Sequence, residues 1–165
     1  FPDRLRDGYG LRFNGNCGTG KTRLAASVLT ELSARFGHPV AAVAAPHFLQ
    51  RLRESYRSDI PEDVEDRLLS RLQTASCLLL DDLGAETATP WGIDRIYLVL
   101  DHRNRYMLPT LVTSNFSPRE LAERTDPRLV SRLMGMCKIY ELGGSDYRLK
   151  EGPNGRTGGA GAARF

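Results

Sequence analysis

The sequence predicts a three-layer α/β fold, in which a five-stranded parallel sheet is covered by helices on both faces. Short apolar segments alternate along the chain with longer segments whose apolar residues recur at helical spacing. This alternation is typical of parallel sheets, because each crossover between parallel strands needs a connection long enough for a helix. The 165 residues, 41% of them hydrophobic and 26% charged, suffice for one domain of ordinary size.

The expected strands are the short apolar segments 9–14, 40–45, 76–81, 110–113 and 138–142. The expected helices cover 21–36, a segment beginning at 46, 61–73, 90–106, a short segment after Ser117, and 127–136. Local signals set several of these boundaries. Gly37 ends the first helix, Ser117 and Glu120 have the spacing of a capping box, and Asp126 precedes a proline in the first turn of the last helix.

Composition and charge exclude several classes of protein. No apolar run approaches the ~18 residues of a membrane span, so we expect no membrane association. The 23 Lys and Arg residues against 20 Asp and Glu give a net charge of +3, which permits a nucleic-acid partner without requiring one. The three cysteines lack the paired spacing of a zinc or redox motif, and free thiols favour a reducing, cytoplasmic compartment.

A glycine-rich segment between the first strand and the first helix has the spacing GxxxxGK[ST] of a phosphate-binding P-loop. Glycines let the main chain curl so that its N–H groups converge on phosphate oxygens at the start of a helix, where they lack helical partners. A lysine adds charge near the outer phosphates, and a threonine hydroxyl can bind Mg²⁺. The expected nucleotide-binding residues are Gly15, Asn16, Cys17, Gly18, Thr19, Gly20, Lys21 and Thr22.

Two adjacent carboxylates, Asp81 and Asp82, end the third expected strand. The carboxyl ends of parallel strands face the ligand crevice of an α/β sheet. We therefore expect Asp81 to share a Mg²⁺ ion with Thr22, and Asp82 to orient or deprotonate the attacking water. Glu86 is the alternative residue for the water.

Taken together, four segments resemble the AAA+ ATPase domain of bacterial replicative helicase loaders of the DnaC/DnaI type. They are the P-loop, LLLDDLGAE at 78–86, Thr113-Ser114-Asn115 and Ser131-Arg132-Leu133. The IstB-type transposition ATPases share much of this pattern. The resemblance covers about residues 9–148 and implies a P-loop fold of the AAA+ branch. One departure is Asp82, where most AAA+ proteins carry Glu.

Further roles follow from this resemblance. Asn115, an amide at the end of an apolar strand, corresponds to the residue that senses the γ-phosphate. Arg132 corresponds to the arginine finger that acts on a neighbouring subunit's nucleotide and so implies a homo-oligomer, with Arg128 as the second choice. Arg148 resembles a position near nucleotide or DNA. The segment 46–73 resembles an element that contacts single-stranded DNA, and a solvated amphipathic hairpin is the equal alternative. Tyr56 within it fits the apolar face with Leu49 and Leu52, which favours a core position over stacking on a base.

The predicted domains are a P-loop ATPase unit at 1–142 and a flexible tail at 143–165, where seven of 23 residues are glycine. Nothing after Gly143 has the pattern of a C-terminal helical lid. Because the chain begins with Phe1 rather than Met and reaches the P-loop within 15 residues, we interpret it as a fragment, or as a domain that has lost an N-terminal partner.

The implied activity is slow, Mg²⁺-dependent ATP hydrolysis, stimulated by oligomerisation or DNA. The implied work is delivery of the replicative DNA helicase onto single-stranded DNA. Two alternatives stay open: an IstB-type helper ATPase acting on duplex DNA in transposition, and a nucleotide-binding assembly module with little turnover.

Overall fold

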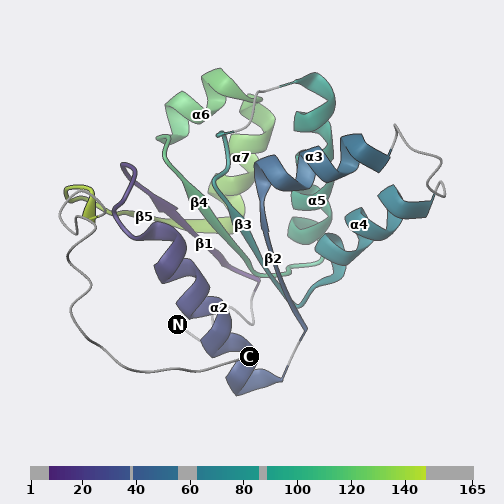
Figure 1. Cartoon of the computed structure of the whole chain (residues 1–165), viewed down its shortest axis with the longest axis horizontal. Helices are drawn as coiled ribbons and strands as arrows, with labels where there is room; N and C mark the ends of the chain where they lie inside the picture. The colour runs from purple at the N-terminus through teal and green to yellow at the C-terminus, as the bar shows by residue number, and fades with distance from the viewer. Residues whose placement is uncertain (1–7, 38, 56–62, 86–88, 148–165) are drawn as a thin grey trace.

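The computed structural model describes residues 8–37, 39–55, 63–85 and 89–147 (Figure 1). Within this part of the chain, five parallel strands form one sheet with the order β2-β3-β4-β1-β5. The strands are β1 (Gly10–Asn14), β2 (Val40–Ala44), β3 (Cys77–Asp81), β4 (Thr110–Ser114) and β5 (Cys137–Glu141). The expected parallel α/β fold is confirmed, and each strand lies within about one residue of its predicted boundaries.

The helices also follow the predicted order. They are α2 (Lys21–Phe36), α3 (Ala45–Ser55), α4 (Asp63–Thr74), α5 (Pro90–Arg105), α6 (Pro118–Arg124) and α7 (Pro127–Met136). The local signals act as expected. Gly37, with a φ of 61°, ends α2 by donating its N–H to Ser33 O, and Ser117 and Glu120 form the complete capping box of α6.

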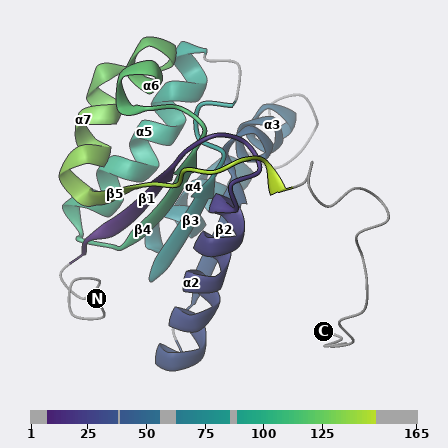
Figure 2. The same cartoon turned by 90° about the vertical axis from the view of Figure 1, so that its left-hand side faces the viewer.

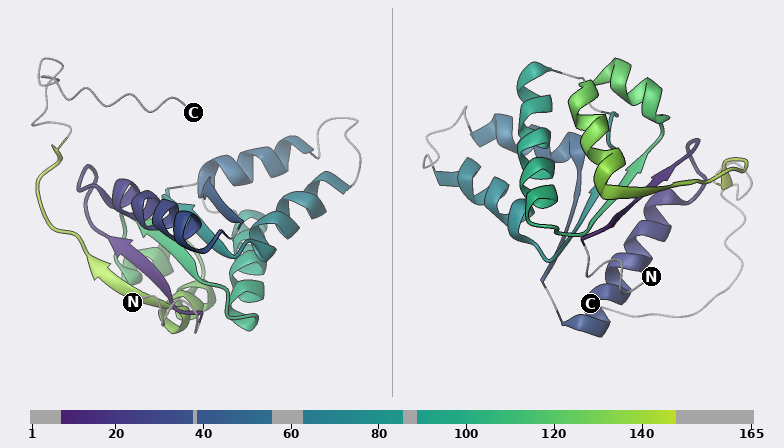
Figure 3. Two further views of the ribbon diagram at one scale, coloured as in Figure 1. Left: turned by 90° about the horizontal axis from the view of Figure 1, so that it is seen from below. Right: turned by 180° about the vertical axis from the view of Figure 1, so that it is seen from behind.

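Helices lie on both faces of the sheet, which makes the fold three-layered (Figures 1, 2 and 3). The sheet separates two apolar clusters. Helix α2 covers one face, and α5 and α7 lie on the other. Strand β3 shows how the sequence assigns its side chains to the two faces. Leu78 and Leu80 belong to the cluster beneath α5 and α7, whereas Leu79 packs beneath α2. Because successive side chains alternate, Asp81 lies on the same face as Leu79, toward α2.

A fully buried arginine joins the helical layer to the sheet. Arg103 of α5 donates to the carbonyl oxygens of Leu72, Ala75 and Pro109 over 2.7–2.8 Å, and to that of Gln73 over 3.2 Å. Its Nε donates to the Thr110 hydroxyl over 2.9 Å. The guanidinium therefore satisfies backbone acceptors at the end of α4 and at the start of β4. Burial lowers the pKa of Arg103 to about 10, which leaves it cationic at neutral pH.

The segment after β5 returns toward the P-loop. Leu142 donates its N–H to Asn14 O over 2.8 Å, and Tyr147 donates its N–H to Gly18 O over 3.1 Å. Residues 143–147 of the predicted tail thus lie against the loop that follows β1. The rest of the predicted tail, 148–165, lies outside the described residues. The expectation that no C-terminal helical lid follows Gly143 therefore stays a prediction.

Candidate active site

The P-loop, residues 15–20, joins β1 to α2 and keeps a conformation that needs glycine at two close contacts. Gly15 has a φ of 140°, and a Cβ there would lie 2.1 Å from the Leu142 carbonyl oxygen. Gly18 has a φ of 73°, and a Cβ there would lie 1.7 Å from Asp146 Oδ1. A larger residue at Gly15 would displace the backbone of Leu142, and one at Gly18 would displace the Asp146 side chain.

The loop opens α2 without a side-chain cap. Gly20 is the N-cap residue in the left-handed region, and Leu24 N–H donates to Gly20 O over 2.9 Å as the helix begins. The first N–H groups of α2 therefore receive no capping oxygen from the N-cap side chain, and the positive end of the helix dipole lies at the P-loop. This arrangement suits an anion such as a phosphate.

Lys21 is almost entirely buried, with 5% of its surface exposed, and folds back over the loop. Its Nζ donates to the Gly15 carbonyl oxygen over 2.8 Å and to the Asn16 carbonyl oxygen over 2.7 Å. Thr19 Oγ1 also donates to Asn16 O, over 3.0 Å. These bonds hold the lysine charge at the centre of the loop, close to the amides that a phosphate would contact.

Thr22 and Asp81 lie in direct contact although they are 59 residues apart in the chain. Thr22 Oγ1 donates to Asp81 Oδ1 over 2.9 Å, and Thr113 Oγ1 donates to the same oxygen over 2.6 Å. The strand alternation explains the meeting, since Asp81 and Thr113 both point toward α2 from neighbouring strands. A hydroxyl and a carboxylate are hard oxygen ligands of the kind Mg²⁺ prefers, so the donor set fits a magnesium ion shared with a phosphate chain.

Asp82 and Asn115 line the same cavity as the P-loop. This cavity has a volume of about 730 Å³. Its lining comprises Cys17, Gly18, Thr19, Gly20, Lys21, Thr22, Arg23, Ala26, Asp82, Asn115 and Tyr147. Asp82 takes a left-handed φ of 55°, and its N–H donates to Thr113 Oγ1 over 2.9 Å. Thr113 thus contacts both the carboxylate of Asp81 and the backbone of Asp82.

The loop that carries Asn115 is held from two sides. Ser114 Oγ donates to the Leu83 carbonyl oxygen over 2.7 Å, which ties the end of β4 to the turn after β3. On the other side, the buried Arg12 donates from Nη2 to Phe116 O over 3.1 Å and from Nε to Asn14 Oδ1 over 2.8 Å. Desolvation lowers the pKa of Arg12 from its ordinary value. These bonds fix the backbone on either side of Asn115.

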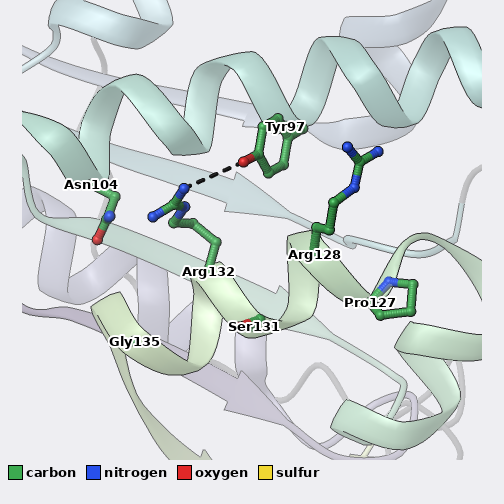
Figure 4. A pocket seen from close by; sticks show the side chains of 7 residues that line it. All are labelled: Tyr97, Asn104, Pro127, Arg128, Ser131, Arg132 and Gly135. Atoms are coloured by element: carbon green, nitrogen blue, oxygen red, sulfur yellow. Dashed lines mark hydrogen bonds between the residues drawn. The ribbon is translucent and has the colours of Figure 1, made fainter.

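Arg132 and Arg128 line a separate cavity of about 550 Å³ between α5 and α7 (Figure 4). Arg132 Nη2 donates to the Tyr97 hydroxyl over 3.3 Å and to Asp101 Oδ1 over 2.7 Å. The hydrogen bond to Tyr97, and then the charge of Asp101, raise the pKa of the guanidinium. Arg128 pairs with Asp126 over 2.7 Å. Helix α7 lies on the sheet face opposite α2, so the structure does not bring these arginines into the P-loop cavity.

Three residues singled out in the sequence, Glu86, Tyr56 and Arg148, lie outside the described residues. Sequence reasoning also missed two contributors to the site. Thr113 is one. It lies two residues before Asn115, on the face of β4 that meets Asp81, and this position could have indicated its contact with Asp81. Tyr147 is the other, and the signal for it was the resemblance of its neighbour Arg148 to a position near nucleotide or DNA.

Known proteins resemble this chain in sequence and in fold. No family model matches the chain. It is 37% identical over 154 residues to the replicative helicase loader DnaI of Bacillus subtilis (strain 168), which covers 86% of this chain and 48% of that protein. The solved structure of the DnaC helicase loader superimposes with a TM-score of 0.74 at 26% identity, covering 83% of this chain and 80% of that one.

The chain belongs to the AAA+ domain family of the bacterial helicase loaders. A crystal structure of DnaI, 28% identical, agrees with a TM-score of 0.71 and covers 85% of this chain and 73% of that one. The chain spans about half the length of the curated loaders that it matches. Among the described helices, none is both long and apolar enough to cross a membrane.

Proposed function

We propose that this chain is the ATPase domain of a helicase loader, which binds and slowly hydrolyses ATP with Mg²⁺ to deliver a replicative DNA helicase onto single-stranded DNA. The observation that carries the proposal is the 2.9 Å contact between Thr22 and Asp81 at the mouth of the P-loop. It supports a shared metal in a chain whose relatives are named replicative helicase loaders. Such a protein would work in the cytoplasm.

The P-loop holds the phosphates in this proposal. Amides 18–22 donate to phosphate oxygens, and Lys21 exchanges its bonds to the Gly15 and Asn16 carbonyl oxygens for bonds to the outer phosphates. Thr22 and Asp81, which bond to each other in this structure, would hold the Mg²⁺ ion. When bound, this ion neutralises charge on the phosphate chain. Thr113, which bonds to Asp81, keeps the carboxylate oriented.

The hydrolytic step uses the residues that follow β3 and β4. Asp82 accepts a hydrogen bond from the attacking water and so orients it or takes its proton, with Glu86 as the alternative. Asn115 donates its amide hydrogens to the γ-phosphate and so reports whether that phosphate is present. Because Asp reaches less far than Glu, hydrolysis with Asp82 is expected to be slow.

Arg132 acts on the nucleotide of a neighbouring subunit. Its place on α7, across the sheet from α2, supports action in trans, because it does not line the cavity of its own P-loop. A guanidinium delivered from outside would stabilise the charge on the γ-phosphoryl group during transfer. ATP would thereby drive assembly into an oligomer, and hydrolysis would release it.

A mixing experiment tests the site and the trans arrangement together. Phosphate release is measured with and without single-stranded DNA for the unmodified protein, Lys21→Ala, Arg132→Ala and an equal mixture of the two variants. We expect each variant to be inactive alone and the mixture to recover part of the activity, because Arg132 of one subunit meets an intact P-loop of the other. ATP binding by Lys21→Ala is measured alongside; unchanged binding would refute the site, and full turnover by Arg132→Ala would refute the finger alone.

Helicase loading is tested with the full-length protein and the replicative helicase of its own host. Strand unwinding from a single-stranded circle should require the loader and ATP, and should fail with Lys21→Ala. ATP-dependent bending of duplex DNA without any helicase requirement would instead favour the transposition helper. Tight nucleotide binding without phosphate release, with or without DNA, would favour the assembly module.

A further inference from the structure

The segment 142–147 is bonded at its start to the last residue of β1 and at its end to the P-loop, so its position follows that of the loop. Leu142 pairs with Asn14 just before the loop begins, and the Tyr147 N–H donates to Gly18 O at its middle. Between them, the Asp146 carboxylate lies so close to Gly18 that a Cβ on this glycine would meet Oδ1 at 1.7 Å. These contacts hold the backbone of Tyr147 beside the P-loop.

The Tyr147 side chain combines high exposure with a place in the cavity lining. It is 60% exposed, yet it lines the 730 Å³ cavity together with the P-loop and the first turns of α2. A large aromatic group exposed at the edge of a cavity offers a flat apolar surface to a ligand.

The strand order determines which part of a nucleotide would reach this ring. Strand β1, which leads into the P-loop, lies between β4 and β5. Asp82 and Asn115 enter the cavity from β3 and β4, on one side of the loop, whereas Tyr147 enters from the segment after β5, on the other side. If the γ-phosphate lies next to Asp82 and Asn115, the ribose and base must extend away from them, toward Tyr147.

We propose that Tyr147 forms the nucleoside subsite of this cavity, with its ring stacked against the base of the bound nucleoside triphosphate. The proposal rests on the proposed ATP-binding function and adds a residue that recognises the base. Aromatic side chains stack on every nucleobase, because each base has a flat π-face. The subsite therefore distinguishes a nucleoside triphosphate from inorganic triphosphate and favours the larger purines over pyrimidines.

The test compares ATP with inorganic tripolyphosphate, which has the phosphates but no base. Binding of both ligands is measured by calorimetry in the presence of Mg²⁺. The proteins are the unmodified chain, Tyr147→Ala, Tyr147→Phe and the control Tyr106→Ala, which removes an equally exposed tyrosine outside the cavity. We expect Tyr147→Ala to weaken ATP binding about tenfold and to leave tripolyphosphate binding unchanged. Tyr147→Phe, which keeps the ring, and Tyr106→Ala should bind ATP within about twofold of the unmodified chain.

The possible failures are distinguishable. If Tyr147→Ala binds ATP as tightly as the unmodified chain, or weakens both ligands equally, the nucleoside subsite is wrong while the P-loop assignment stands. The subsite is equally wrong if the unmodified chain binds tripolyphosphate as tightly as ATP. If the unmodified chain binds neither ligand, the proposed function fails and the subsite fails with it.

Discussion

Replacing Arg103 by methionine should destabilise the fold more than any exposed substitution on the same helix. Arg103 is fully buried and makes five hydrogen bonds, four of them to backbone carbonyl oxygens. Methionine replaces the aliphatic part of the side chain but has no donor and no group in place of the guanidinium, so Arg103→Met leaves buried acceptors at the end of α4 and the start of β4 without their partner. The space left by the guanidinium adds a packing loss to the lost hydrogen bonds.

The expected size follows from these bonds. A hydrogen bond to a charged group contributes about 1.5–3 kcal/mol, and removing the charge recovers part of its desolvation cost. The net loss is therefore well below the sum of five bonds, and we expect about 3 kcal/mol. In a domain of this size that loss lowers the midpoint of thermal unfolding by about 9 °C.

The assay is urea unfolding followed by circular dichroism, with Arg105→Met as the matched control. Arg105 lies on the same helix and pairs with Asp101 over 3.0 Å, but its side chain is 73% exposed. An exposed pair contributes little, so Arg105→Met should cost less than about 1 kcal/mol. Equal stability of the two variants would refute the structural role given to Arg103.

Two further predictions concern the site. Asp101→Asn should raise phosphate release about threefold at limiting protein concentration. Arg132 then no longer has to leave its 2.7 Å pair with Asp101 to reach a neighbouring subunit. An unchanged or lower rate would contradict the trans role. Cys17 is exposed, whereas burial raises the pKa of Cys77 to about 11 and that of Cys137 to about 12. A thiol reagent at pH 8 should therefore label one cysteine in the folded chain and three after unfolding, and ATP should protect that one; rapid labelling of all three would contradict the described burial.

Much of the fold was predictable because its signals are local. The glycine that ends α2, the capping box of α6 and the apolar strand segments each act within a few residues, so the sequence places these elements closely. The approach of Asp81 to Thr22 was predictable for a different reason. A motif fixes Thr22 at the start of a helix, and parallel topology brings the end of the acidic strand to the same edge.

The remaining features depend on register and on long-range packing. Thr113 reaches Asp81 only because β3 and β4 pair with Leu80 beside Val112, and no local pattern sets that register. Arg12 and Arg103 are fully buried, although charged residues are usually exposed, because the acceptors that they satisfy come from distant segments. The glycine-rich composition after Gly143 predicted flexibility, and it could not indicate that Tyr147 contacts Gly18.

The central claim is that Thr22 and Asp81 share a metal ion with a triphosphate held by the P-loop. Its most direct test is the affinity for ATP with and without Mg²⁺, measured by calorimetry for the unmodified chain, Thr22→Val and Asp81→Asn. We predict that Mg²⁺ tightens ATP binding to the unmodified chain and that both variants lose this gain while still binding ATP without the metal. If either variant keeps the full Mg²⁺-dependent gain, the two side chains do not hold the ion and the claim is contradicted.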